Sequence, residues 1–156
     1  MANLQLQDLP GGGRTLITVG LLACLAINIV VNCSKNAVPS VTVQQLEQLA
    51  KSGEDMFLLD VRTEPEYIAN RLSFTDLRVS HDSLGNHLDQ LPQDKDTRIY
   101  CFCRSGRRST HSTRYLMSLG YNSVYNVTGG ILAWQKKGFE TVSGPESSDS
   151  TSPRSP

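Results

Sequence analysis

The stretch that decides the fold is IYCFCRSGRRSTHSTRYLMSLGY, residues 99–121. Its apolar start, with Arg98 before it, predicts a buried strand over residues 98–102. Residues 107–120 predict a helix that is ended by Gly120. Cys103 therefore lies where a strand ends and a helix is about to begin. In open α/β sheets ligands bind at this edge, so the position alone makes Cys103 a candidate site residue.

The loop after Cys103 has the features of an anion cradle. Gly106 permits a turn that bends backbone N–H groups inward, and the next helix adds the positive end of its dipole. A cysteine beside Arg104, Arg107 and Arg108 is expected to have a lowered pKa and a favoured thiolate. Cys103 is therefore the expected nucleophile, because a charged loop contradicts the apolar setting of an inert buried cysteine.

The other cysteines receive different roles. Cys101 shares the side-chain parity of Cys103 inside the strand, and we expect it to pack in the core. The four cysteines lack the spread of a disulfide framework, and the three histidines do not supply zinc-ligand spacing. We therefore expect no structural disulfide, no metal and no cofactor.

Composition limits the number of domains and the kinds of partner that we expect. The chain has 156 residues, of which 38% are apolar, which suits one domain with accessory segments. Lys plus Arg and Asp plus Glu both number 15, so the formal charges cancel. This balance does not indicate a nucleic-acid partner, and any basic site has to be local.

The first segment, residues 1–35, contains an apolar run at 15–33 that is just long enough to span a bilayer as a helix. We expect a membrane anchor or an export signal, placing the protein in a bacterial cell envelope with the domain on the periplasmic or outer face. Two tetrapeptides, LLAC at 21–24 and VVNC at 30–33, resemble a lipoprotein cleavage box. Cleavage, lipidation and an uncleaved anchor all remain open.

Residues 39–142 carry alternating helix and strand patterns. Thr42 is expected to cap a helix ended by Gly53, and Pro65 lies in the first turn of another. Helices are also expected over 83–91 and 131–138, strands over 56–61 and 123–127, and a further strand within 71–79. Such alternation predicts an α/β fold with a parallel sheet covered on both faces. The Ser/Pro-rich residues 143–156 predict a disordered tail.

The residues from Cys103 to Ser109, CRSGRRS, resemble the active-site loop of rhodanese-like sulfurtransferases, Cys-x-x-Gly-x-Arg-Ser/Ala. Three more segments resemble the family in order: DVR at 60–62 followed by Glu66 and Tyr67, the helix end at 116–121, and NVTGGILAW at 126–134. Four segments together are far more specific than one. The resemblance implies a single rhodanese-like domain, with a five-stranded parallel sheet flanked by helices on both faces.

One segment departs from the family. Where the family usually has Gly-His-Ile-x-Gly-Ala, this chain has NRLSFT at residues 70–75. The departure concerns the turn between a helix and a strand and leaves the cysteine loop intact.

The resemblance implies a ping-pong sulfur transfer. The Cys103 thiolate attacks the outer sulfur of thiosulfate or a similar anionic donor, sulfite leaves, and the resulting persulfide passes its sulfur to cyanide or a thiol. The loop residues bind the donor through backbone N–H groups and the three arginines; these residues are Arg104, Ser105, Gly106, Arg107, Arg108 and Ser109. Asp60 and Arg62 either orient this loop or form a plain structural ion pair.

Two other functions remain as alternatives. Phosphatases and arsenate reductases share the fold, but they typically carry Cys-x5-Arg. Here Ser109 occupies the position six after Cys103, and an arginine comes one residue earlier, at Arg108. The loop therefore matches the shorter, sulfur-transferring kind. The other alternative is a non-catalytic module that carries sulfur or docks a protein.

Overall fold

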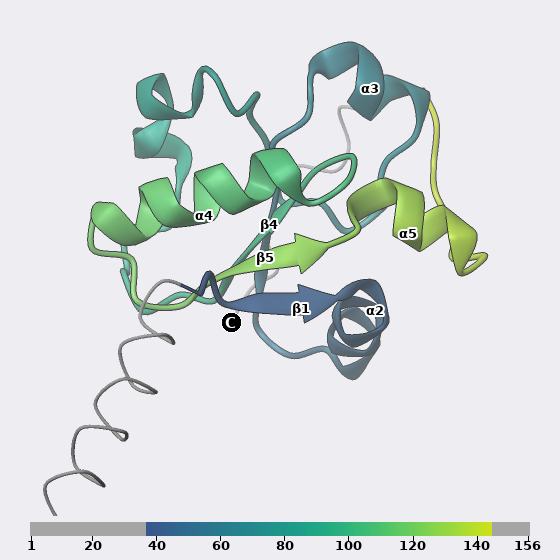
Figure 1. Cartoon of the computed structure of the whole chain (residues 1–156), viewed down its shortest axis with the longest axis horizontal. Helices are drawn as coiled ribbons and strands as arrows, with labels where there is room; N and C mark the ends of the chain where they lie inside the picture. The colour runs from purple at the N-terminus through teal and green to yellow at the C-terminus, as the bar shows by residue number, and fades with distance from the viewer. Residues whose placement is uncertain (1–36, 145–156) are drawn as a thin grey trace, which may run out of the picture. The chain divides into compact units, whose positions relative to one another are not determined.

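The computed structural model describes residues 37–144, where strands and helices alternate along the chain (Figure 1). The strands are β1 (Ser40–Thr42), β2 (Phe57–Asp60), β3 (Leu77–Arg78), β4 (Ile99–Phe102) and β5 (Val124–Thr128). The helices are α2 (Val43–Ser52), α3 (Glu64–Ala69), α4 (Arg107–Ser118) and α5 (Gly130–Lys136).

The five strands form one parallel sheet in the order β1-β5-β4-β2-β3. This confirms the predicted α/β fold with its five-stranded parallel sheet. The sequence patterns did not predict β1, because it has only three residues and no apolar run. It is placed by pairing with β5, where Ser40 lies opposite Asn126 and Thr42 opposite Thr128. Thr42 then begins α2, as its sequence predicted, and accepts a hydrogen bond from the backbone N–H of Gln45.

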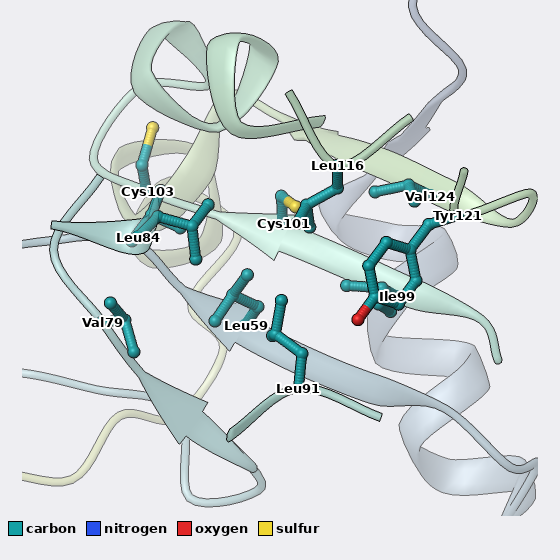
Figure 2. Close-up of a cluster of buried hydrophobic side chains, with 11 residues drawn as sticks. Leu59, Val79, Leu84, Leu91, Ile99, Cys101, Cys103, Leu116, Tyr121 and Val124 are labelled. Atoms are coloured by element: carbon teal, nitrogen blue, oxygen red, sulfur yellow. The ribbon is translucent and has the colours of Figure 1, made fainter. Parts of the chain in front are cut away.

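Helices cover both faces of the sheet, and the central strand β4 divides its side chains between two cores. Cys101 and Cys103 belong to the core under α4 and the segment after β3 (Figure 2). Tyr100 and Phe102 point to the opposite core, which α2 and α5 cover. All four are buried, since side chains alternate between the faces of a strand that is covered twice. Trp134 of α5 is likewise buried in this second core.

The predicted helix over residues 83–91 is wrong. The chain forms two short 3-10 turns instead, Leu84–Asn86 and Leu88–Gln90. In an α-helix the carbonyl of Ser83 would accept from the N–H of His87, but here it accepts from the N–H of Asn86 and contacts Nδ1 of His87 at 3.0 Å. Leu84 and Leu91 are still buried, so the apolar pattern was interpreted correctly as inward-facing and incorrectly as α-helical.

The first residues of the predicted tail, and Val142 before them, are hydrogen-bonded to the domain. Val142 pairs with Arg71 through two backbone hydrogen bonds of 2.8 and 2.9 Å. The Ser143 hydroxyl donates to the carbonyl of Ala69, and the N–H of Gly144 donates to the carbonyl of Ile68. The prediction of disorder is therefore wrong for Ser143 and Gly144. Residues 145–156 lie outside the described part of the chain.

Within residues 37–144, no helix combines the length and the apolar character needed to cross a membrane. The predicted apolar segment, residues 15–33, lies outside the residues that the structure describes.

The turn between β5 and α5 rests directly on the loop that follows β4. The N–H groups of Ile131 and Leu132 donate to the carbonyl oxygens of Cys103 and Arg104, at 2.9 and 3.2 Å. Gly130 makes this approach possible. A Cβ at Gly130 would lie 2.1 Å from the Cys103 oxygen, and its φ of +51° lies in the left-handed region. The start of α5 therefore fixes the backbone of the loop.

We predict that Gly130→Ala lowers the free energy of unfolding by roughly 2–4 kcal/mol, because strain at positive φ adds to a backbone clash. Gly138→Ala is the matched control. Gly138 also has positive φ, but a Cβ there meets no atom within 4 Å, so only the conformational cost of about 1 kcal/mol applies. Urea unfolding of both variants measures the difference. Equal losses would show that the approach of α5 to the loop does not constrain the fold.

Candidate active site at the end of β4

The sulfur of Cys103 lies in a cradle of hydrogen-bond donors. The side chain is fully buried and its thiol is free. The N–H of Gly106 lies 3.1 Å from Sγ, and the hydroxyl of Ser109 lies 3.3 Å from it. Burial raises the pKa of the thiol, but hydrogen bonds from the Ser109 hydroxyl and from the N–H groups of Ser109, Ser105 and Gly106 outweigh it and lower the pKa. The predicted anion cradle is present, and it surrounds this sulfur.

Cys101 lies two residues away on the same side of β4, and it is also free and fully buried. Here burial is the largest effect and raises the pKa of the thiol to about 12. This environment is that of an inert, packed cysteine, as its place inside the strand predicted.

The side chain of Ser109 is hydrogen-bonded to Asn126 of β5. The Ser109 hydroxyl lies 2.6 Å from Oδ1 of Asn126, and both side chains are buried. Sequence reasoning treated Asn126 only as part of a motif and assigned it no place in the site. Its position in a strand expected beside β4 was the available signal, because neighbouring parallel strands bring such positions together, and Asn126 lies opposite Cys101.

A pocket of about 420 Å³ opens over the loop. It is lined by Glu66, His81, Arg104, Ser105, Arg107 and Arg108. Arg104 and Arg107 are exposed, so their charges are available to an anion. Cys103 is not among these lining residues, since it is buried behind the loop. A substrate that reaches the sulfur from this pocket therefore has to pass the loop side chains.

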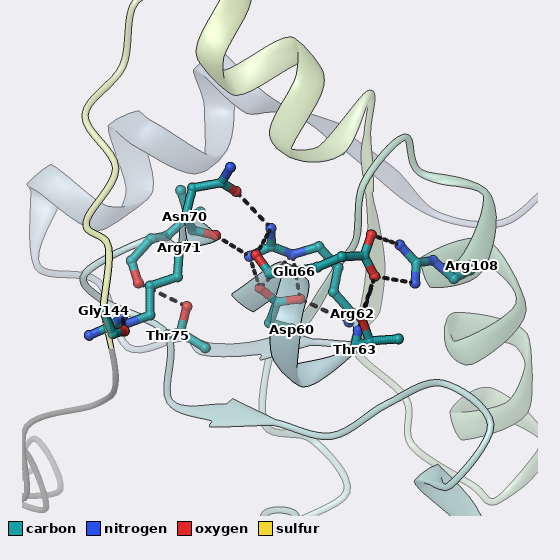
Figure 3. A network of polar contacts seen from close by, with 10 residues as sticks. Asp60, Arg62, Thr63, Glu66, Asn70, Arg71, Thr75, Arg108 and Gly144 are labelled. Carbon is teal, nitrogen blue, oxygen red and sulfur yellow. Dashed lines mark hydrogen bonds and ion pairs between the residues drawn. The ribbon is translucent and has the colours of Figure 1, made fainter. Parts of the chain in front are cut away.

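Arg108 is paired within the protein. Its two terminal nitrogens donate to the two carboxylate oxygens of Glu66 on α3, at 2.7 and 2.6 Å (Figure 3). This bidentate pair joins the start of α4 to α3 across 42 positions of sequence. The sequence predicted that Arg108 binds the donor, but the structure places its guanidinium on Glu66. The exposed cations of the pocket are thus Arg104 and Arg107.

Asp60 and Arg62 form a fully buried ion pair beside the site. Both Asp60 oxygens accept from Arg62, at distances of 2.5–3.0 Å. The guanidinium also donates to the carbonyl groups of Glu66 and Asn70, and it lies over the Phe102 ring. These contacts reach α3 and the turn after it, rather than the Cys103 loop. Of the two expectations, the contacts match the structural ion pair.

Within residues 37–144, no three or more His, Cys, Asp or Glu side chains form a cluster that could hold a metal ion.

Comparison with known proteins agrees with this geometry. Residues 42–137 match the model of the rhodanese-like domain. The chain belongs to the rhodanese-like domain family. It is 37% identical over 99 residues to a sulfurtransferase of Allochromatium vinosum, covering 64% of this chain and 90% of that protein. A putative sulfurtransferase of Bacillus subtilis is 30% identical over 99 residues, covering 63% and 91%. These relatives support an enzyme of the sulfurtransferase kind.

Solved structures show the same fold. A rhodanese-related protein of Thermoplasma volcanium superposes with a TM-score of 0.58 at 27% identity, covering 67% of this chain and 97% of that one. A thiosulfate sulfurtransferase of Pseudomonas aeruginosa gives a TM-score of 0.63 at 24% identity, covering 69% of this chain and 21% of that one. At that identity the second similarity concerns the fold alone.

The ion pair between Glu66 and Arg108 makes the stability of this rhodanese-like domain pH-dependent. Hydrogen bonds from Arg108 are the largest cause that lowers the pKa of Glu66 from 4.5 to about 2. Because the folded-state pKa is depressed, the stabilisation is complete above the unfolded value and is lost as pH falls from about 4.5 towards 2.

We predict that Glu66→Gln lowers the free energy of unfolding at pH 7 by about 1–2 kcal/mol, allowing for solvent screening of a partly exposed pair. The difference from the wild type shrinks below pH 4.5 and vanishes near pH 2. Urea unfolding at several pH values measures it. Glu64→Gln is the control, since that carboxylate is exposed and lies 3.8 Å from Arg78. A pH-independent difference for Glu66→Gln would contradict the assignment.

Proposed function

We propose that the protein transfers sulfane sulfur from thiosulfate or a similar anionic donor to cyanide or a thiol, through a persulfide on Cys103. The observation that carries this proposal is the Cys103 sulfur itself, which is buried yet accepts a hydrogen bond from the N–H of Gly106 and has the Ser109 hydroxyl 3.3 Å away, contacts that favour its anionic form. A sulfurtransferase needs a sulfur that is anionic as a thiolate before transfer and as a persulfide after it.

The proposed first step is an attack by the Cys103 thiolate on the outer sulfur of thiosulfate. A sulfur–sulfur bond forms to Cys103, the original sulfur–sulfur bond breaks, and its electron pair leaves with sulfite. Charge is conserved, because thiolate and thiosulfate give a persulfide anion and sulfite. The acceptor then attacks the outer sulfur of the persulfide and regenerates the thiolate. No cofactor enters this sequence of steps.

The loop contributes to these steps in two ways: it donates hydrogen bonds to the sulfur, and its charges attract the donor. Its N–H groups are placed to hold the anionic sulfur without reorganisation, and the Ser109 hydroxyl lies within reach of it. Arg104 and Arg107 are exposed at the pocket and are the charges expected to attract the donor dianion. Arg108 is paired with Glu66, so the proposal does not assign it this role. The pocket thus favours a small anion over a neutral substrate.

Phosphate or arsenate chemistry fits the loop less well. In a Cys-x5-Arg loop the arginine turns inward and completes the ligand shell of a tetrahedral oxyanion. Here Ser109 occupies that position, and the neighbouring Arg108 turns away to Glu66. The loop therefore lacks the guanidinium that such an oxyanion requires.

We predict that the purified full-length chain forms thiocyanate from thiosulfate and cyanide, and that Cys103→Ser reduces the rate to that of buffer. Cys101→Ala is the matched control and is expected to retain activity, because Cys101 is packed in the core. Mass spectrometry after thiosulfate treatment should show one added sulfur atom on the peptide that contains Cys103. Activity that survives Cys103→Ser, or hydrolysis of an aryl phosphate that depends on Cys103, would overturn the proposal.

We also propose that residues 15–33 attach the domain to a bacterial membrane or export it, with the domain on the periplasmic or outer face. The support is the run of apolar residues without a charge at 16–31. We predict that the protein fractionates with membranes of the expressing bacterium and that mass spectrometry of its N-terminus finds either the intact segment or a modified Cys24 or Cys33. A soluble cytoplasmic protein with an intact N-terminus would contradict this.

A further inference from the structure

The hydroxyl group of Ser109 carries one proton and lies near three possible hydrogen-bond acceptors. Its Oγ lies 3.3 Å from Sγ of Cys103, 3.1 Å from the carbonyl oxygen of Gly106 and 2.6 Å from Oδ1 of Asn126. A hydroxyl donates one hydrogen bond and accepts up to two. Whether the sulfur receives the proton therefore depends on the other two groups.

The Gly106 carbonyl already has two donors. It accepts from the N–H of Thr110 at 3.0 Å and from the Thr110 hydroxyl at 2.7 Å. Because a carbonyl oxygen offers two lone pairs, it does not depend on Ser109 for a partner. The competition for the Ser109 proton is left between Cys103 and Asn126.

The side-chain amide of Asn126 can either accept or donate in its hydrogen bond with Ser109. A separation of 2.6 Å between two oxygens requires a proton between them, so in the structure Ser109 donates to the amide oxygen. A half-turn of the terminal torsion would put the amide nitrogen in the same place, and this torsion has broad, roughly two-fold preferences. The amide would then donate to Ser109 and release its hydroxyl proton for the sulfur.

We propose that Asn126 is a positioning residue that decides, through Ser109, whether the Cys103 sulfur receives a hydroxyl hydrogen bond. While Cys103 is a thiol, the Asn126 oxygen accepts the Ser109 proton. When the sulfur is a thiolate or a persulfide anion, the amide turns and donates to Ser109, which donates to the sulfur. Neither side chain gains or loses a proton, and the thiol proton leaves to solvent.

The switch gives a buried sulfur a donor only when it is charged. A hydrogen bond to an ionised group is roughly twice as strong as a neutral one, and a buried anion without donors is costly. An aspartate at position 126 could only accept, so it would hold the Ser109 proton away from the sulfur. The amide of Asn126 supplies both roles within one buried side chain.

The other titratable and charged groups around Cys103 and its loop come from four parts of the fold, and the first is Cys101 in β4. Glu66 belongs to α3 and His81 follows β3, while three arginines lie in the loop and at the start of α4: Arg104, Arg107 and Arg108. None of them is changed by substitutions at positions 109 and 126. Their effects on the Cys103 pKa therefore cancel when Ser109→Ala is compared in two backgrounds.

The test is the pH midpoint for alkylation of Cys103 by iodoacetamide in the full-length chain, followed by peptide mass spectrometry. In the wild type, Ser109→Ala should raise this midpoint by about one pH unit, the loss of a hydrogen bond to a charged group. In the Asn126→Asp background, Ser109→Ala should leave the midpoint unchanged. Ser112→Ala should also leave it unchanged, since that hydroxyl donates to the carbonyl of Arg108.

Equal shifts from Ser109→Ala in both backgrounds, or no shift in either, would overturn the proposal. The wild type allows a second measurement if Asn126→Asp fails to fold. The NMR signals of the Asn126 side-chain amide should change with the same midpoint as Cys103, and this change should be lost in Ser109→Ala. Signals that stay constant through the midpoint would also overturn it. The inference rests on the proposed function in treating Cys103 as the ionising sulfur, but alkylation does not require sulfur transfer, so the two can fail separately.

Discussion

The contact between the start of α5 and the loop after β4 is the constraint on which the site depends. A trans peptide points its carbonyl and its N–H in opposite directions. The Arg104 carbonyl is turned outward, where it accepts from the N–H of Leu132. The N–H of Ser105 belongs to the same peptide and is thereby turned inward, to the sulfur of Cys103. Gly130 allows the approach, so a glycine in the last helix orients a donor in the cradle.

Burial alone does not decide what a cysteine does in this fold. Cys101 and Cys103 project from the same side of one strand, and neither is exposed to solvent. Burial opposes the anionic form at both. The difference is the backbone around the sulfur: Cys101 lies within a strand whose N–H groups serve the sheet, whereas Cys103 is followed by a loop whose N–H groups converge on it. The end of the strand thus separates a packed thiol from one with a lowered pKa.

Sequence patterns predicted the features of the fold that depend on neighbouring residues alone. They identified the alternating strands and helices, the end of β4 directly before Cys103 and the turn that follows it. They failed at residues 83–91, where two 3-10 turns replace the expected helix and the Ser83 carbonyl contacts Nδ1 of His87. Likewise, Arg108 is one of three similar arginines in the sequence, and only the fold reveals that its guanidinium pairs with Glu66. The neighbours of Asn126 in sequence do not indicate its contact with the loop, and the available signal was its place in a strand beside β4.

Residues 70–75 differ in sequence from the family, and the first of them, Asn70, is hydrogen-bonded to the buried ion pair of Asp60 and Arg62. Arg62 has five N–H donors to satisfy away from water. Two contact Asp60, one contacts the carbonyl of Glu66 and one the carbonyl of Asn70, and the side-chain oxygen of Asn70 accepts the fifth at 3.0 Å. A glycine at position 70 would offer only its carbonyl. The asparagine therefore completes the donors of Arg62, which also holds the backbone of Glu66, the residue that binds Arg108. A substitution in a turn is in this way joined through three side chains to the rim of the cysteine loop.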